Sequence, residues 1–141
     1  MRALAIAVAL AACGGNGGTS GASCMQDGDC TDGAVCAAND LCESPDQVRN
    51  VRIQWTISGQ AASTTSCASI PNLDLYFVPS DGDTSQAFGY APVPCAEGVF
   101  TELKLPNLFT EVQMLDDSSQ AFLGQGTIDS SDSLTVDLTP G

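Results

Sequence analysis

The stretch VRIQWTI, residues 51–57, alternates apolar and polar side chains and decides the expected fold class of this chain. Successive side chains of a β-strand point to opposite faces, whereas a helix would need apolar residues three or four positions apart. The alternation therefore predicts a half-buried strand, with Trp55 in the core rather than on a binding face. The expected inward row is Val51, Ile53, Trp55 and Ile57.

Six further stretches carry strand-like patterns and are separated by turn-rich segments. They are LDLYFV (73–78), AFGYAPV (87–93), VFTELKL (99–105), LFTEVQML (108–115), AFLGQGTI (121–128) and SLTVDL (133–138). About seven short strands at roughly 10-residue spacing are typical of an antiparallel sandwich. The expected fold class is therefore all-β, with an antiparallel sandwich over residues 48–139.

The alternation also predicts which side chains of the stretches 73–78 and 99–105 face the core. The expected inward residues are Leu73, Leu75, Phe77, Val99, Leu103 and Leu105. Asp74, Tyr76 and Lys104 would lie on outer faces. Tyr76, opposite an apolar row, is a candidate binding aromatic, and Tyr90 is a second one.

The segment GVFTELKLPNLFTEVQMLDD, residues 98–117, is similar to part of the carboxypeptidase-regulatory-like or transthyretin-like sandwich. In that family a strand reaches a Pro-Gly turn and a tyrosine-rich strand follows. Here Asn107 stands in the glycine position, and Leu108 or Phe109 in that of the tyrosine. An immunoglobulin-like sandwich is nearly as acceptable, and neither fold has a fixed function.

The amino terminus has the layout of an export signal over residues 1–12, with Arg2 before an uncharged apolar run. Leu10, Ala11, Ala12 and Cys13 resemble the lipobox of bacterial lipoproteins, which implies that Cys13 carries the lipid and becomes the first residue. The alternative is cleavage after Ala11, secretion and a free thiol. Removing Cys13 from the seven cysteines leaves six, which can all pair, and this favours lipidation.

Residues 14–23, GGNGGTSGAS, would then form a flexible tether, because glycine and serine bury nothing. The expected partner is the membrane, which the lipid on Cys13 would enter, and we expect the protein in the cell envelope. Gly14 stands where some sorting systems read an aspartate as an inner-membrane signal, so outer-membrane placement is favoured.

Cys24, Cys30, Cys36 and Cys42 follow at equal intervals within a short segment, residues 24–47. Structural zinc sites favour closer cysteine pairs, and exported thiols oxidise, so two disulfides are expected. Three pairings are open. Cys67 and Cys95 flank two strands, and we expect a third bridge between them.

Four aspartates among these cysteines raise the possibility of a calcium site. They are Asp27, Asp29, Asp32 and Asp40. An EF-hand register is broken, because Thr31, Asp32 and Ala38 occupy the third-ligand, glycine and glutamate positions. Solvated turn carboxylates are the simpler interpretation, so no metal and no cofactor is assigned.

The composition limits the functions that we expect of this chain. Seventeen acidic residues face four basic ones, a net charge of −13, so nucleic acid is not an expected partner. The absence of histidine removes the usual general base, and no catalytic residue is assigned. We expect a non-enzymatic binding, adhesion or accessory module that contacts an envelope protein or polysaccharide. The alternatives are a hydrolase using turn carboxylates such as Asp81 or Asp83, and a purely structural spacer.

Overall fold

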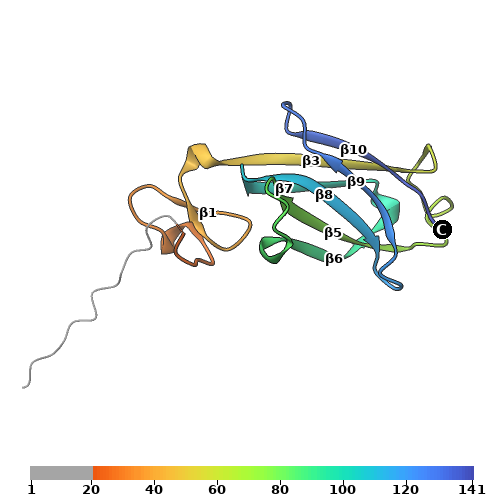
Figure 1. The fold of residues 1–141 in the computed structure, drawn as a ribbon, viewed down its shortest axis with the longest axis horizontal. Helices are drawn as coiled ribbons and strands as arrows, with labels where there is room; N and C mark the ends of the chain where they lie inside the picture. The colour runs from red at the N-terminus through yellow and green to blue at the C-terminus, as the bar shows by residue number, and fades with distance from the viewer. Residues whose placement is uncertain (1–20) are drawn as a thin grey trace, which may run out of the picture.

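A computed structural model provides the structure of the chain and describes residues 21–141. The expected signal peptide (1–12), the lipidated Cys13 and most of the tether lie outside the described residues. The described part contains only strands and short 3-10 helices, and the predicted all-β fold class is confirmed (Figure 1).

Each of the seven expected strands is present. They are β3 (Val48–Ile57), β5 (Asn72–Pro79), β6 (Phe88–Pro94), β7 (Val99–Pro106), β8 (Phe109–Asp116), β9 (Phe122–Thr127) and β10 (Ser133–Leu138). The short strands are β1 (Val35–Cys36), β2 (Cys42–Glu43) and β4 (Gln60–Ala61). The 3-10 helices are η1 (Asp27–Asp29), η2 (Pro45–Gln47), η3 (Thr84–Gln86) and η4 (Cys95–Glu97).

Two sheets form the sandwich. One has the order β6-β5-β8-β9 and is antiparallel throughout. In the other, β3 pairs with β10, β4 and β7. The β10–β3 pair is parallel, from Ser133 opposite Arg52 to Leu138 opposite Ile57, and is the one departure from the expected antiparallel pairing among the described strands. The Asn107–Leu108 link carries the chain from β7 in one sheet to β8 in the other.

The core lies between the sheets and contains the predicted inward row of β3. Val51, Ile53, Trp55 and Ile57 are all buried. The indole Nε1 of Trp55 donates a hydrogen bond of 2.8 Å to the Cys95 carbonyl, which satisfies its polar atom inside the core. The predictions for Trp55 and for the inward row of β5, Leu73, Leu75 and Phe77, are confirmed.

Two glycines let the sandwich close between β9 and β10. A Cβ atom at Gly124 would lie 3.0 Å from Val136 Cγ1, and one at Gly126 would lie 2.6 Å from Leu134 Cδ1. The missing side chains therefore allow β9 to approach β10 closely, and Thr139 N donates to Leu123 O across this side.

The prediction for β7 was wrong at Val99, which stands opposite the exposed Gln54, and at Leu103, which is 59% exposed. The register with β3 shifts between Arg49 opposite Leu105 and Val51 opposite Glu102, and Lys104 has a φ of 56°. This bulge breaks the alternation, so that Glu102 is buried and Leu103 turns outward. Lys104 is only half-buried rather than fully exposed, because its side chain lies against the disulfide-rich segment.

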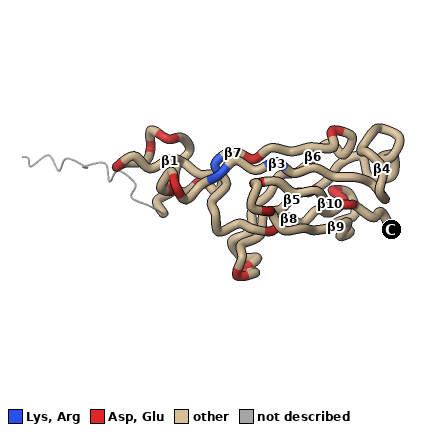
Figure 2. The backbone as a smooth tube through the Cα atoms, turned by 90° about the horizontal axis from the view of Figure 1, so that it is seen from above, with Lys and Arg blue, Asp and Glu red and all other residues tan. Residues whose placement is uncertain are grey.

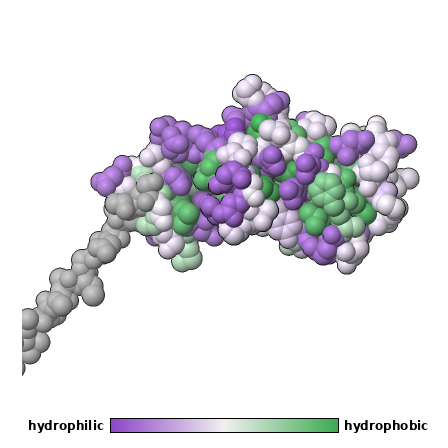
Figure 3. All heavy atoms as spheres, viewed as in Figure 1, coloured by the Kyte–Doolittle hydropathy of each residue, from purple (hydrophilic) through white to green (hydrophobic). Residues whose placement is uncertain are grey.

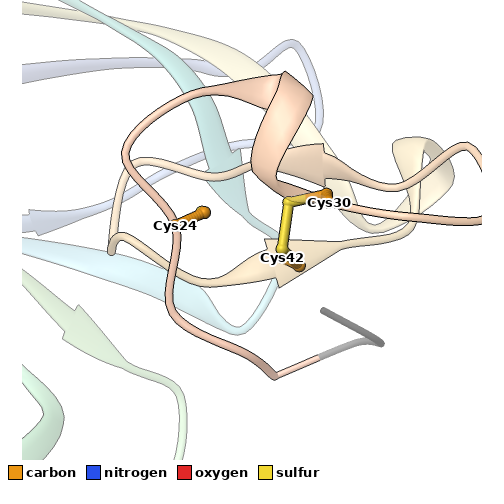
Figure 4. A group of neighbouring side chains, drawn as sticks. All are labelled: Cys24, Cys30 and Cys42. Atoms are coloured by element: carbon orange, nitrogen blue, oxygen red, sulfur yellow. A yellow bond between two sulfur atoms is a disulfide. The ribbon is translucent and has the colours of Figure 1, made fainter. Parts of the chain in front are cut away.

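The disulfide-rich segment has the bridges Cys24–Cys36 and Cys30–Cys42, and Cys67–Cys95 forms the third one. The structure thus selects one of the three pairings that the sequence left open. Figure 4 shows the Cys30–Cys42 bridge with Cys24 beside it. The segment lies at one end of the elongated sandwich (Figure 1). It contacts β7 through a hydrogen bond from Ala38 N to Lys104 O, 3.1 Å long.

Candidate functional site

A groove lies on the outer face of the β6-β5-β8-β9 sheet. Its floor comes from β5 and β8, and its sides come from the loop after β5 and the turn after β8. The volume is about 310 Å³, within the range of small-ligand sites. The lining residues are Tyr76, Val78, Thr84, Ala87, Gln113, Leu115 and Gln120. The predicted binding residue Tyr76 therefore lies in a hollow of the surface.

Tyr76 is placed in the groove by its neighbours on both sides. It stands opposite Gln113 of β8 and Gly89 of β6. A Cβ atom at Gly89 would lie 2.8 Å from Tyr76 Cδ1, so the glycine leaves the space that the tyrosine ring occupies. The Tyr76 ring is half-buried and stacks on no other ring of residues 21–141. Its exposed part is available to a ligand.

The loop wall of the groove is ordered by Asp83. Its carboxylate accepts bonds from Ser85 N, Ser85 Oγ and Gln86 Nε2, and these bonds lower the pKa of Asp83, with the Ser85 hydroxyl as the largest cause. Asp81 Oδ1 accepts the backbone N–H of Asp83. Both carboxylates proposed for a hydrolase are thus used in shaping their own loop.

The opposite wall depends on a buried carboxylate that sequence reasoning placed outside. Asp74 was expected on an exposed face, but it is only 4% exposed. Gln120 covers it and donates from Nε2 to Asp74 Oδ2 at 2.6 Å and to Asp117 O at 3.2 Å. The expectation failed because the turn after β8 folds back over this end of β5, which the alternation within β5 does not reveal.

A second carboxyl group lies against Asp74. Asp74 Oδ1 is buried and receives no hydrogen bond from an N–H or O–H donor of residues 21–141. Its neighbour is Asp117, whose pKa is raised, first by hydrogen bonding with Asp74 and then by burial and the negative charges of Asp74 and Asp116. Asp116 itself accepts bonds from Ser118 and Ser119, which lower its pKa. Asp117 therefore holds its proton to a higher pH than an ordinary aspartate does.

Tyr90, the other predicted binding aromatic, belongs to a different place in the fold. Its ring packs edge-on against Phe88 with centroids 6.2 Å apart, and lies 5.1 Å from that of Phe100 on β7. Burial, and then hydrogen bonding with the Glu102 carboxylate, raise the pKa of Tyr90. Tyr90 thus closes the sandwich between β6 and β7 and does not share the groove with Tyr76.

The calcium candidates do not converge in space. Asp27 contacts Lys104 Nζ at 2.7 Å and accepts the Cys36 N–H, and Asp29 accepts the N–H groups of Met25 and Gln26. Asp32 and Asp40 adopt positive φ angles, 56° and 60°. Within residues 21–141 the single group of potential ligands close enough for a metal is Cys24, Cys30 and Cys42, whose sulfur atoms are used in disulfides.

Two further hollows are less suited to a ligand. The larger one, about 440 Å³, is the seam between the disulfide-rich segment and β7, and its lining includes the paired Asp27 and Lys104. The smaller one, about 300 Å³, lies beside Cys67 and is lined by small side chains, mainly alanine, threonine and proline. Neither offers an aromatic ring or a carboxamide pair as the sheet groove does.

No protein-family model, curated protein or solved structure matches this chain. Among residues 21–141, no helix has the length and apolar character needed to cross a bilayer. Gln113, Gln120 and Asp74 were missed as site residues, because only the pairing of β5 with β8 and the fold of the following turn bring them beside Tyr76.

Proposed function

We propose that this chain is a lipid-anchored, non-enzymatic binding module of the bacterial cell envelope, and that its ligand occupies the groove around Tyr76. The observation that carries the proposal is the composition of the groove. The side chains of Tyr76 and Gln113 make no hydrogen bond with any described residue, although their backbones are paired side by side in the β5–β8 ladder. Polar groups presented in this way on paired strands are pre-organised for a ligand.

The arrangement along the chain suits a tethered module. The described chain begins at Gly21, whose N–H donates to Cys42 O in the disulfide-rich segment. That segment occupies one end of the elongated molecule (Figure 1), and the groove lies on the sandwich beyond it. Residues 21–23 are already paired with that segment, so the proposed tether shortens to residues 14–20, which as a flexible chain would span roughly 13 to 16 Å. A lipid on Cys13 would therefore hold the groove away from the bilayer surface.

The anchor is tested on the intact mass of the full chain taken from membranes, with Cys13→Ala as the variant. We expect a chain that begins at Cys13 with added acyl mass, and release of the Cys13→Ala chain from the membrane fraction. An unmodified chain beginning at Ala12 would make the protein a secreted one and would remove the lipid anchor from the proposal.

Binding is tested by retention of the detergent-solubilised full chain on insoluble envelope material. Gln113→Ala removes one groove carboxamide, and Gln54→Ala removes the same group from an exposed position on β3 of the other sheet. We expect Gln113→Ala to reduce retention and Gln54→Ala to leave it unchanged. Equal retention of all three proteins would refute a role for the groove.

A further inference from the structure

We infer that the groove binds an uncharged polysaccharide chain, laid across β5, β8 and β9, an inference that rests on the proposed function. The groove combines the two kinds of surface that a sugar ring needs. Its C–H faces require an apolar or aromatic platform, and its hydroxyl groups require partners that both donate and accept hydrogen bonds. Tyr76 and Leu115 supply the first, and Gln113 and Gln120 supply the second.

The two carboxamides differ in what they offer. Gln113 is half-buried and its side chain makes no hydrogen bond within the described chain, so the carboxamide oxygen and nitrogen are both available. Gln120 uses Nε2 for Asp74 Oδ2 and Asp117 O, which leaves its carbonyl oxygen to accept from a hydroxyl group. Asp74 is therefore a positioning residue, because it orients the Gln120 amide without itself facing the solvent.

The surface continues beyond the groove, which favours a chain over a single sugar. Leu115 stands opposite Phe122 of β9, and Gln113 stands opposite Gln125. Phe122 is 57% exposed, and its ring stacks on no other ring of residues 21–141. Tyr76 and Phe122 would thus support successive sugar units on either side of Leu115, with Gln113 and Gln125 alongside.

The distribution of charge over the molecule disfavours anionic ligands. The described basic residues are Arg49, Arg52 and Lys104, and all three lie on β3 and β7 of the other sheet. Figure 2 shows the blue residues gathered near β3 and β7, with red residues spread over the molecule. No basic side chain lines the groove, and the whole chain carries a net charge of −13. Uronic acid polymers and phosphate-bearing glycans would be repelled.

A peptide added as an extra strand is disfavoured by the sheet edges. β6 is an edge strand with Pro92 and Pro94, which lack the N–H groups that a partner strand would use. β7 is interrupted by its bulge, and Ala38 already donates to Lys104 O there. On the face shown in Figure 3 the hydrophobic atoms lie in separate patches between hydrophilic ones, unlike a broad apolar protein interface.

The inference is tested with an array of neutral, amino and uronic oligosaccharides, followed by calorimetry of the full detergent-solubilised chain with the neutral hexasaccharides that bind. We expect neutral oligosaccharides to bind, and affinity to rise with chain length. Tyr76→Ala should weaken binding about tenfold, equivalent to about 1.4 kcal/mol, through loss of the aromatic platform. Phe122→Ala should weaken only the longer oligosaccharides.

Controls separate binding from folding and the sugar class from the proposed function. Gln113→Ala should weaken the same oligosaccharides several-fold without altering the melting temperature, and Gln54→Ala should bind normally. Binding confined to uronic oligosaccharides, or neutral binding unaffected by both Tyr76→Ala and Gln113→Ala, would overturn the inference. Envelope retention that depends on Gln113 without any neutral sugar on the array would overturn the sugar class alone. If neither Gln113-dependent retention nor binding of a neutral sugar were observed, the proposed function would be overturned as well.

Discussion

Lys104 Nζ lies 2.7 Å from Oδ1 and 2.9 Å from Oδ2 of Asp27, so one ammonium group joins the disulfide-rich segment to the bulge of β7. Asp27 Oδ1 also accepts the Cys36 N–H at 2.9 Å, and Lys104 O accepts the Ala38 N–H. Hydrogen bonding with Lys104 is the largest of the causes that lower the pKa of Asp27. The pair and its two backbone bonds together orient the segment against the sandwich.

Asp27→Asn should loosen this junction without unfolding the sandwich. The amide keeps the size of the carboxylate but loses the charge that attracts Lys104, and exposed ion pairs contribute little to global stability. We expect faster hydrogen exchange at the Cys36 and Ala38 amides and unchanged exchange in β5 and β8. High salt should produce the same effect in the parent chain. Unchanged exchange at both amides would show that the ion pair does not help to hold the segment against β7.

Trp55→Phe should destabilise the sandwich by about 1 to 3 kcal/mol, because it leaves the buried Cys95 carbonyl without its 2.8 Å hydrogen bond and removes buried apolar surface. Urea unfolding followed by circular dichroism measures the change. Phe100→Leu, in a partly buried position at the sandwich margin, is a control for loss of an aromatic ring. If Trp55→Phe lowered the free energy of unfolding no more than Phe100→Leu does, the indole hydrogen bond would contribute nothing.

Replacing both Cys67 and Cys95 by alanine should lower the free energy of unfolding by about 3.6 kcal/mol. The bridge joins residues 28 apart in sequence, and without it the unfolded chain gains the entropy of the opened loop. Both cysteines are buried beside the core, so loss of packing adds to this figure. The matched pair Cys24→Ala with Cys36→Ala should leave the unfolding of the sandwich nearly unchanged. A similar loss from both double variants would show that the segment and the sandwich unfold as one unit.

Asp117→Asn should raise the melting temperature at neutral pH. The folded-state pKa of Asp117 is raised above 3.8, so its contribution to stability is present below that pH and is lost as the pH rises through the raised value. The asparagine cannot be ionised and can donate to Asp74 at every pH. Thermal melts from acid to neutral pH should therefore show a gap between variant and parent that widens as the pH rises.

Asp83→Asn should change the stability at neutral pH in the opposite direction to Asp117→Asn. Its folded-state pKa is lowered by bonds from Ser85 and Gln86, so its contribution to stability is present at neutral pH and is lost as the pH falls. The variant should be less stable than the parent at neutral pH, and the gap should close in acid. A gap independent of pH in both variants would contradict the assigned carboxyl interactions.

Prediction from the sequence succeeded where a strand has one buried face and an uninterrupted alternation. β3 and β5 show this, since Trp55, Leu75 and Phe77 lie in the core as expected. It failed at Leu103, where a bulge with Lys104 at positive φ inverts the alternation, and at Asp74, which the turn after β8 covers. Neither the bulge nor the covering turn can be recognised from the sequence of the strand that it affects.

The candidate site was only partly predictable for a similar reason. The position of Tyr76 opposite an apolar row indicated an outward ring, and the ring lines the groove. Gln113 and Gln120 are 37 and 44 residues further along the chain, and no local feature links them to Tyr76. Tyr90 is 37% exposed, but its ring contacts Phe88 and Phe100 at the margin of the sandwich and lies outside the groove.

The sequence by itself determined the all-β class, the positions of the seven sandwich strands and the use of six cysteines in three disulfides, because side-chain period, turn residues and cysteine parity are local or countable properties. Only the tertiary structure decided the disulfide pairing, the parallel alignment of β10 with β3, the inward turn of Glu102 and the meeting of Tyr76, Gln113 and Gln120 in one groove. These depend on which distant segments come into contact, and that is set by the packing of the whole sandwich.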